Sequence, residues 1–461
     1  MNTIWWIRRD LRLTDNAALH SALEPFGSAQ DKADSVLPVF ILDLAFDSAS
    51  ARRKNFLYEG LHALDKELRE RGSYLLIRTG KPLEVLKQIV VETKADAIFA
   101  EEDFTPYARK RDMEIEHYLP LQLVNGQTVH HPNAILKVDG KPYTVYTPYS
   151  KAWKAKLPLQ LTLYPTPEKI NTPFEITNEK LPRFKVSPLF AAGEQEALVG
   201  LEEFLFKKIY SYGEDRNRMD LEGTSSLSPY LRFGMIGLRQ AVSAARQAMV
   251  DGRGEASKRS AEIWLNELIW REFYIQILYH FPYVSKTAFN QSLANIPWRN
   301  NLSEFEAWKR GETGVPVVDA AMRQLKEIGW MHNRARMVVA SYLVKDLLID
   351  WRWGEAWFME NLLDGDPAAN NGGWQWTVGT GTDAAPYFRI FNPVLQSAKF
   401  DPNGDYIRRW IPELRGVETK HIHAPWENGI KVTGYPVHPI VERNKERTLQ
   451  AYKLSKEEMK I

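Results

Sequence analysis

The sequence contains no cysteine. Without thiols the chain cannot form disulfides, thiolate zinc sites, cysteine-ligated iron–sulfur clusters or a cysteine nucleophile. It also lacks any run of about 18 uninterrupted apolar residues, which a membrane-spanning helix needs. The N-terminus, MNTIWWIRRDLRL, has no long apolar segment and no small-residue cleavage site of a secretory signal. We therefore expect a cytoplasmic protein with no membrane partner, in which any redox chemistry uses a carrier other than sulfur.

A strong charge of either sign is missing as well, since the formal net charge is only +2. Bulk charge therefore does not indicate a nucleic-acid partner, which would require basic residues gathered on one face. Tryptophan, in contrast, is abundant: many of the 15 tryptophans cluster between Trp264 and Trp376. A plain core is usually filled with Leu, Ile and Val, so this enrichment indicates a specific role for the indoles.

The length of 461 residues predicts two domains, since it exceeds what one hydrophobic core usually serves. Residues 1–130 alternate apolar runs with helical patterns, which predicts a Rossmann-like α/β domain with a parallel sheet covered on both faces. The predicted strands are 4–7, 36–42, 74–77 and 97–100, and the predicted helices are 53–71 and 82–92.

Prolines recur in residues 131–195, where periodicity is weak, and this stretch predicts a connector on the surface. Residues 196–461 predict an all-α domain. Its clearest helical patterns cover residues 260–279, 317–328, 333–350 and 357–363.

One glycine motif suggests a dinucleotide site, but its context does not fit. Gly379-Thr-Gly381-Thr-Asp-Ala384 matches the GxGxxA pattern. That pattern requires a buried strand before it and a helix after it, and neither is predicted here. A loop is the better interpretation.

A stripe of polar and aromatic side chains recurs at helical spacing at residues 264, 267, 271 and 274, with Trp270 at its edge. The stripe fits a partly solvated helix with a Glu and Arg pair. It also fits a site for a flat heteroaromatic ligand, because rings stack while a carboxylate and a guanidinium orient hydrogen bonds.

A second helix start places Asn333, Arg336 and Met337 on one face, as an ordinary amphipathic helix with basic surface residues also would. Beyond it, Asp364 and Asp366 flank a glycine and could bind either a metal ion or hydroxyl groups.

Taken together, the motifs of this chain resemble those of the DNA photolyase and cryptochrome family over nearly its whole length. Within the family, the chain is similar to class I cyclobutane pyrimidine dimer photolyases. The motifs are WIRRDLRLTDN at 6–16, GTSSLSP at 223–229, WLNELIWREF at 264–273, GWMHNR at 329–334, DGDPAANNGGWQW at 364–376 and YFRIFNP at 387–393.

The resemblance implies a light-driven repair enzyme, a lyase in which reduced anionic FAD in the helical domain donates an electron to a flipped-out dimer in DNA. The Asp pair would then bind ligand groups and no metal, and Asn370 would lie beside flavin N5. The implied FAD-binding residues are Tyr212, Thr224, Ser225, Ser226, Leu227, Ser228, Trp264, Glu267, Arg271, Asn333, Arg336, Asp364, Asp366 and Asn370.

The same resemblance implies a lesion pocket. Glu267 would hydrogen-bond the carbonyl edge of the dimer and supply a proton after electron transfer, and Asn333 and Met337 would complete the pocket with Asn370. Trp270 and Trp376 would cradle the apolar side of the dimer, replacing lost base stacking. The residues implied to contact phosphates and the pocket rim are Arg216, Arg334 and Arg389. Without the resemblance, each would be interpreted as an ordinary surface charge.

Trp298, Trp351 and Trp374 match the electron-transfer chain that reduces oxidised flavin in the family. Taken alone, each of them would be interpreted as a residue that packs in the core. A second, antenna chromophore is expected in the N-terminal domain. Asp43, Arg53 and Asp103 resemble the deazaflavin- or flavin-antenna branch of the family more than its folate branch, whose folate-binding glutamate is replaced here by Thr105.

The expected partner is double- or single-stranded DNA containing cyclobutane dimers, bound by a monomer that is cytoplasmic, bacterial and nucleoid-associated when on DNA. A cryptochrome-type blue-light signalling flavoprotein is the alternative, which Asn370 disfavours because plant cryptochromes commonly have aspartate there. A (6-4) photolyase would carry a histidine pair where this chain has His332-Asn333 and Met337.

Overall fold

The computed structural model describes residues 1–25, 32–46, 50–182 and 190–458. Contacts divide the chain into two compact units. The first unit consists of Met1–Tyr210 and Ser225–His280, and the second of Ser211–Thr224 and Phe281–Ile461. Among the described residues, no helix is both long and apolar enough to cross a membrane.

The first unit is built on a parallel five-stranded sheet in the order β3-β2-β1-β4-β5. This confirms the predicted α/β class. The apolar runs become strands because both faces of the sheet are covered, and β1 and β2 are buried almost throughout. The strands are β1 (Asn2–Ile7), β2 (Ser35–Leu42), β3 (Leu76–Thr79), β4 (Ala97–Glu101) and β5 (Leu121–Val124).

Two details of the predicted sheet are wrong. The strand expected at 74–77 begins two residues later, at Leu76, and β5 was not predicted. β5 has only four residues and is buried at one of them, so its hydrophobic signal is short and weak.

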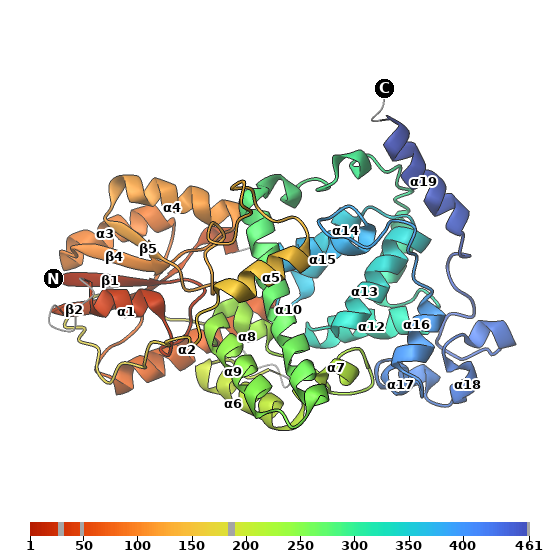
Figure 1. Ribbon diagram of the computed structural model, residues 1–461, viewed down its shortest axis with the longest axis horizontal. Helices are drawn as coiled ribbons and strands as arrows, with labels where there is room; N and C mark the ends of the chain where they lie inside the picture. The colour runs from red at the N-terminus through yellow and green to blue at the C-terminus, as the bar shows by residue number, and fades with distance from the viewer. Residues whose placement is uncertain (26–31, 47–49, 183–189, 459–461) are drawn as a thin grey trace. The chain divides into compact units, whose positions relative to one another are not determined.

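Helices flank this sheet and continue into the C-terminal part of the first unit (Figure 1). Beneath them, β1, β2 and β4 contribute apolar side chains such as Ile4, Val39 and Ile98 to one core. The helices of this unit are α1 (Ala17–Leu23), η1 (Leu44–Phe46), α2 (Ala51–Glu70), α3 (Pro82–Thr93), α4 (Pro106–Tyr118), α5 (Tyr146–Lys156), α6 (Glu194–Lys207), α8 (Ser228–Phe233), α9 (Leu238–Asp251) and α10 (Glu255–His280).

The proline-rich stretch contains a helix that the sequence pattern did not predict, α5. Pro148 lies in its first turn, where the missing N–H costs nothing because that donor has no partner inside a helix. Three buried side chains, Tyr149, Ser150 and Trp153, form its inner face.

The second unit is helical, in agreement with the predicted all-α class. Its core gathers Trp308, Trp351 and Trp374 with aliphatic side chains, all of them nearly inaccessible to solvent. The elements are α7 (Tyr212–Asp215), η2 (Pro282–Ser285), η3 (Gln291–Leu293), α11 (Leu302–Arg310), α12 (Pro316–Ile328), α13 (Asn333–Ser341), η4 (Tyr342–Asp346), α14 (Trp351–Asn361), α15 (Pro367–Val378), α16 (Pro393–Phe400), α17 (Asp405–Trp410), η5 (Pro412–Leu414), α18 (Thr419–Ile422), η6 (Pro425–Asn428) and α19 (Lys445–Glu458).

The α-helix predicted over 333–350 is wrong in its second half, where the helix changes type and ends early. α13 ends at Ser341, a π-helical turn follows at Tyr342–Asp346, and Leu348 has a φ of +53°. Lys345 lies buried inside this turn and donates to the backbone oxygens of Val378 at 2.7 Å and Tyr387 at 3.1 Å. These tertiary contacts override the local periodicity.

Candidate functional site

An ion pair joins two of the residues predicted to bind FAD. Nη2 of Arg336, on α13, donates to Oδ2 of Asp364 at 2.7 Å, and Nε of Arg336 donates to the backbone oxygen of Met331 at 2.8 Å. Asp364 is buried, and its other oxygen, Oδ1, has no hydrogen-bond partner in the described part of the chain. A buried carboxylate oxygen without a donor is costly, so this atom is suited to accept a hydrogen bond from a ligand.

Two further predicted residues lie at the start of α15. Asp366 is the N-cap, and its Oδ1 accepts hydrogen bonds from the backbone N–H groups of Ala368 at 3.0 Å and Ala369 at 3.1 Å. One turn later, the Asn370 amide nitrogen donates to the backbone oxygen of Glu355 at 3.0 Å. This bond fixes the plane of the Asn370 amide.

Sequence reasoning missed the acid that supports this region. The Glu355 side chain accepts a hydrogen bond from Asn371 at 2.9 Å, and burial raises the pKa of Glu355 to about 7. Neither residue stood out in the sequence, because an Asn next to Asn370 and an acid within a helix are both ordinary.

The first turn of α13 presents the residues predicted for the lesion pocket. Asn333 is exposed, and its amide nitrogen lies 3.9 Å from Sδ of Met337, one turn along the same face. The N-cap, His332, is buried, and its Nδ1 accepts a hydrogen bond from the Arg334 N–H at 3.1 Å. Burial, together with the charges of Arg334 and Arg336, lowers the pKa of His332 to about 4. His332 is therefore neutral at physiological pH.

Basic side chains gather beside this turn. Arg334 donates from Nη2 to Oδ1 of Asn217 at 2.6 Å, and its guanidinium lies 4.4 Å from the centre of the Phe400 ring. Burial, with the neighbouring charge of Arg216, lowers the pKa of Arg334. Arg389, in contrast, is exposed in the segment after α15. Two of the three predicted phosphate contacts are thus neighbours.

The predicted electron-transfer tryptophans share one hydrophobic core. Trp374 and Trp351 are buried, and Trp298 is half-buried against the same cluster. Trp374 packs edge-on against Phe358, with ring centroids 5.1 Å apart, and against Trp308 at 6.3 Å. Trp308 was not singled out in the sequence, and it lies among these rings.

The close packing of Trp374 depends on a glycine. A Cβ added at Gly354, on α14, would lie 2.1 Å from Cη2 of Trp374. Only glycine allows the indole of α15 to approach the backbone of α14 so closely. Nε1 of Trp374 is buried and has no hydrogen-bond partner among the described residues.

The helix α10 carries the predicted residues of the first unit. Trp264 is buried against the Phe204 ring at 4.9 Å, and Arg271 donates from Nη2 to the backbone oxygen of Leu231 at 3.3 Å. Glu267 and Trp270 are half-buried on the same helix. The stripe predicted from the spacing is therefore present.

The remaining predicted residues lie in short segments. Tyr212 is buried at the start of α7, with the Arg216 guanidinium 5.7 Å from its ring centre, and Trp376 is half-buried on α15. In the hydroxyl-rich segment, Leu227 is buried and the four hydroxyl residues are half-buried: Thr224, Ser225, Ser226 and Ser228. Thr224 belongs to the second unit and the other four belong to the first.

Two of the residues predicted for an antenna, Asp43 and Asp103, follow the carboxyl ends of β2 and β4, the edge at which open α/β sheets bind ligands. Asp43 accepts a hydrogen bond from the Tyr107 hydroxyl at 2.5 Å, and Asp103 lies 3.8 Å from Nη1 of Arg9. Arg53 is buried on α2. Guanidinium charges, Arg9 first, lower the pKa of Asp103 although its burial acts in the opposite direction.

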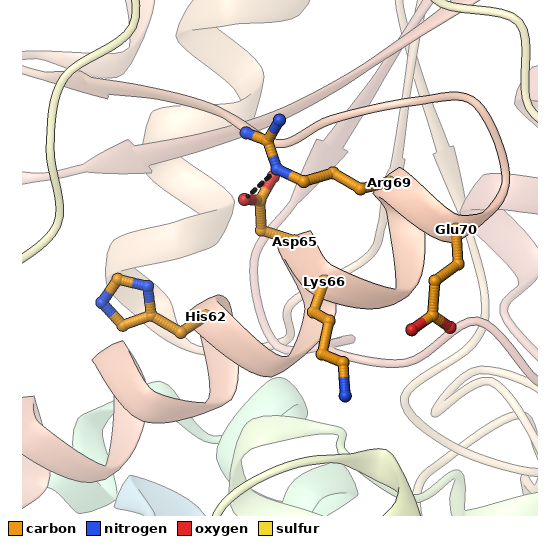
Figure 2. Close-up of a pocket in the computed structure, with 5 residues that line it drawn as sticks. All are labelled: His62, Asp65, Lys66, Arg69 and Glu70. Atoms are coloured by element: carbon orange, nitrogen blue, oxygen red, sulfur yellow. Dashed lines mark hydrogen bonds and ion pairs between the residues drawn. The ribbon is translucent and has the colours of Figure 1, made fainter.

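A surface pocket in the first unit has no predicted residue in its lining (Figure 2). Its five lining residues all come from α2: His62, Asp65, Lys66, Arg69 and Glu70. Asp65 is already engaged, since it accepts from Arg69 Nε at 2.8 Å and from the Leu75 N–H at 2.8 Å. Within the described residues, no group of three or more His, Asp or Glu side chains is arranged to hold a metal ion.

Comparisons with known proteins agree with this arrangement. The chain matches two family models, one described as DNA photolyase over residues 3–169 and one described as FAD binding domain of DNA photolyase over residues 264–456. A deoxyribodipyrimidine photo-lyase of Synechococcus sp. is 39% identical over 466 residues, which cover 96% of this chain and 94% of that protein.

The chain is also similar to solved structures of photolyases. A class III photolyase from Agrobacterium tumefaciens matches with a TM-score of 0.91 and 35% identity, over 99% of this chain and 98% of that chain. An archaeal photolyase from Sulfolobus tokodaii, described with two FAD molecules, matches with a TM-score of 0.82 and 33% identity over 100% of both chains. The chain therefore belongs to the DNA photolyase family.

Membership of the family confirms the expected enzyme class, a DNA repair lyase with a FAD-binding domain. The class I subtype is not confirmed, since one matched structure is described as class III. The residues present fit FAD: Asp364 offers an unpaired buried acceptor beside Arg336, and Asn370 is held with its amide plane fixed.

Proposed function

We propose that this chain is a deoxyribodipyrimidine photolyase that uses light to split cyclobutane pyrimidine dimers in DNA. The observation that supports this most strongly is the similarity over nearly the full chain to relatives that carry that name. Bound reduced FAD would supply the electron that opens the cyclobutane ring on illumination. The chain itself would bind, orient and protect the reacting groups.

For the flavin, we assign binding roles to the residues predicted from the sequence, with Asp364 and Arg336 at their centre. Oδ1 of Asp364 is the unpaired acceptor, and Arg336 holds the carboxylate in place. Asn370, a neutral amide, would hydrogen-bond flavin N5 without adding a negative charge, which favours the reduced anionic form.

For the lesion, Glu267 would hydrogen-bond the carbonyl edge of the flipped-out dimer, and Asn333 and Met337 would line the same pocket. Trp270 and Trp376 would stack against its apolar side, where each base–aromatic contact contributes about 1–3 kcal/mol. Arg216, Arg334 and Arg389 would contact flanking phosphates.

We assign the further details on the same basis. Residues 196–461 would form the catalytic domain and residues 1–130 the antenna domain, joined by the connector 131–195. The antenna would be a flavin or deazaflavin near Asp43, Arg53 and Asp103, and the subtype would be class I. The enzyme would act as a cytoplasmic monomer on single- or double-stranded DNA.

The test uses purified, photoreduced protein and oligonucleotides with one defined lesion. Blue light should restore the cyclobutane dimer and leave a (6-4) lesion unchanged, as measured by chromatography of the digested DNA. Persistence of the cyclobutane dimer would overturn the proposal. A chromophore extract of the same preparation identifies the antenna by its absorption spectrum.

A further inference from the structure

One face of the Trp270 indole is covered by an aromatic ring from the proline-rich connector. Tyr146, the first residue of α5, stacks on Trp270 with ring centroids 3.7 Å apart and ring planes only 4° apart. Phe273 meets the edge of the indole at 5.4 Å with an interplanar angle of 85°. Trp270 remains half-buried, so part of the indole is still accessible to solvent, and a third ring, that of Tyr274, lies 5.5 Å from it at an interplanar angle of 36°.

Tyr146 is itself held against the helix that carries Trp270. Its hydroxyl donates to the backbone oxygen of Asn266 at 2.8 Å. Asn266 lies one helical turn before Trp270 on α10. Tyr146 therefore contacts α10 twice, by the hydrogen bond to the Asn266 backbone and by the ring stack on the Trp270 indole. The stack is therefore fixed at both ends of the tyrosine side chain.

The rest of α5 is attached to α10 along its length. The Trp153 indole N–H donates to Glu272, and Tyr149 packs against Phe273 with ring centroids 5.2 Å apart. Lys154 forms an ion pair with Glu262 at 2.7 Å. These contacts keep α5 in place independently of Tyr146, so the ring of Tyr146 can be changed without releasing the helix.

We infer that Tyr146 is a positioning residue for lesion recognition: it holds the Trp270 indole in one plane, so that the opposite face is ready to stack on the dimer. The inference rests on the proposed function, in which Trp270 contacts the lesion. An indole that is free to rotate must be ordered when the lesion binds, and ordering one such side chain lowers affinity by about twofold to tenfold. Tyr146 removes that cost before binding.

The experiment measures binding in the dark of the FAD-loaded full chain to an oligonucleotide that contains one cyclobutane thymine dimer. Tyr146→Leu should weaken binding about threefold to tenfold, consistent with the loss of one aromatic pair. The repair yield per absorbed photon at saturating DNA should stay unchanged, because electron transfer begins only after binding. Tyr146→Phe keeps the ring and should retain most of the affinity.

Two controls separate positioning from packing. In a Trp270→Leu background, Tyr146→Leu should cause no further loss of dimer affinity, since the side chain it positions is gone. Tyr143→Leu removes another half-buried connector tyrosine, whose ring lies 6.3 Å from Tyr149, and should bind the dimer as the wild type does. If Tyr146→Leu does not fold, Tyr146→Met, which also removes the aromatic ring, is used in the same binding measurement.

Equal dimer affinity of Tyr146→Leu and the wild type would overturn the inference, as would the same loss in both the wild-type and Trp270→Leu backgrounds. A wild-type protein that binds dimer-containing and undamaged oligonucleotides equally well would instead overturn the proposed function, and the inference with it. Selective loss of affinity for the dimer oligonucleotide, with affinity for undamaged DNA retained, supports the inference.

Discussion

Glu272 is a buried acid at the contact between α10 and the connector. Its carboxyl oxygens accept hydrogen bonds from the His130 N–H at 2.8 Å and from the Trp153 indole, and burial raises its pKa to about 8. The group keeps its proton in the folded chain over a range in which the unfolded chain has already released it. The stabilisation that this proton gives the folded chain is therefore lost as pH rises through that range, and the free energy of unfolding falls.

We predict a pH-dependent effect of Glu272→Gln. Between the ordinary pKa of 4.5 and about 8, Glu272 lowers the wild-type free energy of unfolding by up to about 1.4 kcal/mol per pH unit. The variant lacks this slope, so its stability relative to the wild type should rise from pH 5 to pH 8 in denaturant unfolding. Glu255→Gln, at the exposed start of the same helix, should follow the wild-type curve.

At Trp298 we predict a separation of two activities. Trp298→Phe should slow the photoreduction of oxidised flavin at least tenfold, because a phenyl ring is much harder to oxidise, yet leave repair by chemically reduced enzyme intact. Transient absorption measures the rate of photoreduction, and the repair assay measures repair by the chemically reduced enzyme. Trp353→Phe, a half-buried neighbour in the same core, is the control. Equal photoreduction rates in Trp298→Phe and the wild type would reject the relay.

Sequence motifs single out the candidate site residues, but the contacts that hold these residues in place could not be predicted. The pairing of Arg336 with Asp364 joins two motifs that were both recognised. Tyr146 and Glu272 belong to contacts between segments far apart in the chain, and nothing in the local pattern of a proline-rich stretch indicates which ring it will stack on.

Among the elements, α14 and α15 form the contact on which the geometry of the tryptophans depends. A Cβ at Gly354 would overlap Trp374 at 2.1 Å, whereas a Cβ at Gly373 on α15 meets nothing within 4 Å. The two glycines therefore serve different purposes in neighbouring helices.

We predict opposite effects of alanine at these two glycines. Gly354→Ala should lower the free energy of unfolding by about 1–3 kcal/mol through overpacking, and it should slow photoreduction by displacing Trp374. Gly373→Ala should be neutral or raise stability by about 0.5–1 kcal/mol, because alanine favours the helix. Denaturant unfolding of both variants measures this; equal destabilisation would contradict the packing argument.

Element boundaries followed the sequence pattern where burial was uniform. The apolar runs of β1, β2 and β4 predicted their strands, and the long periodic pattern predicted α10. The pattern failed where tertiary contacts decide, as in the π-helical turn around buried Lys345.

At the scale of the whole molecule, cofactor and fold are expected to be coupled. Asp364 leaves Oδ1 unpaired and buried, so the chain without ligand bears the cost of an unsatisfied acceptor. Any molecule that binds only the folded state raises its stability.

We predict that removal of FAD lowers the melting temperature and that added FAD restores it. At a hundredfold excess over the dissociation constant the gain should be about 2.7 kcal/mol. Asp364→Ala should show a smaller increase at the same FAD concentration, in scanning calorimetry. Asp65→Ala, in the α2 pocket away from the predicted residues, should show the full increase. An equal increase in Asp364→Ala would remove that residue from the binding set.

The helix α10 has one more consequence. It runs without a break for 26 residues, and it carries both Trp264, assigned to the flavin, and Trp270, assigned to the lesion. Six residues of helix place these anchors about 9 Å apart along its axis. A continuous helix thus sets the spacing between them, with no hinge in between. The rate of electron transfer from flavin to lesion should therefore not change when glycerol raises the viscosity of the solvent.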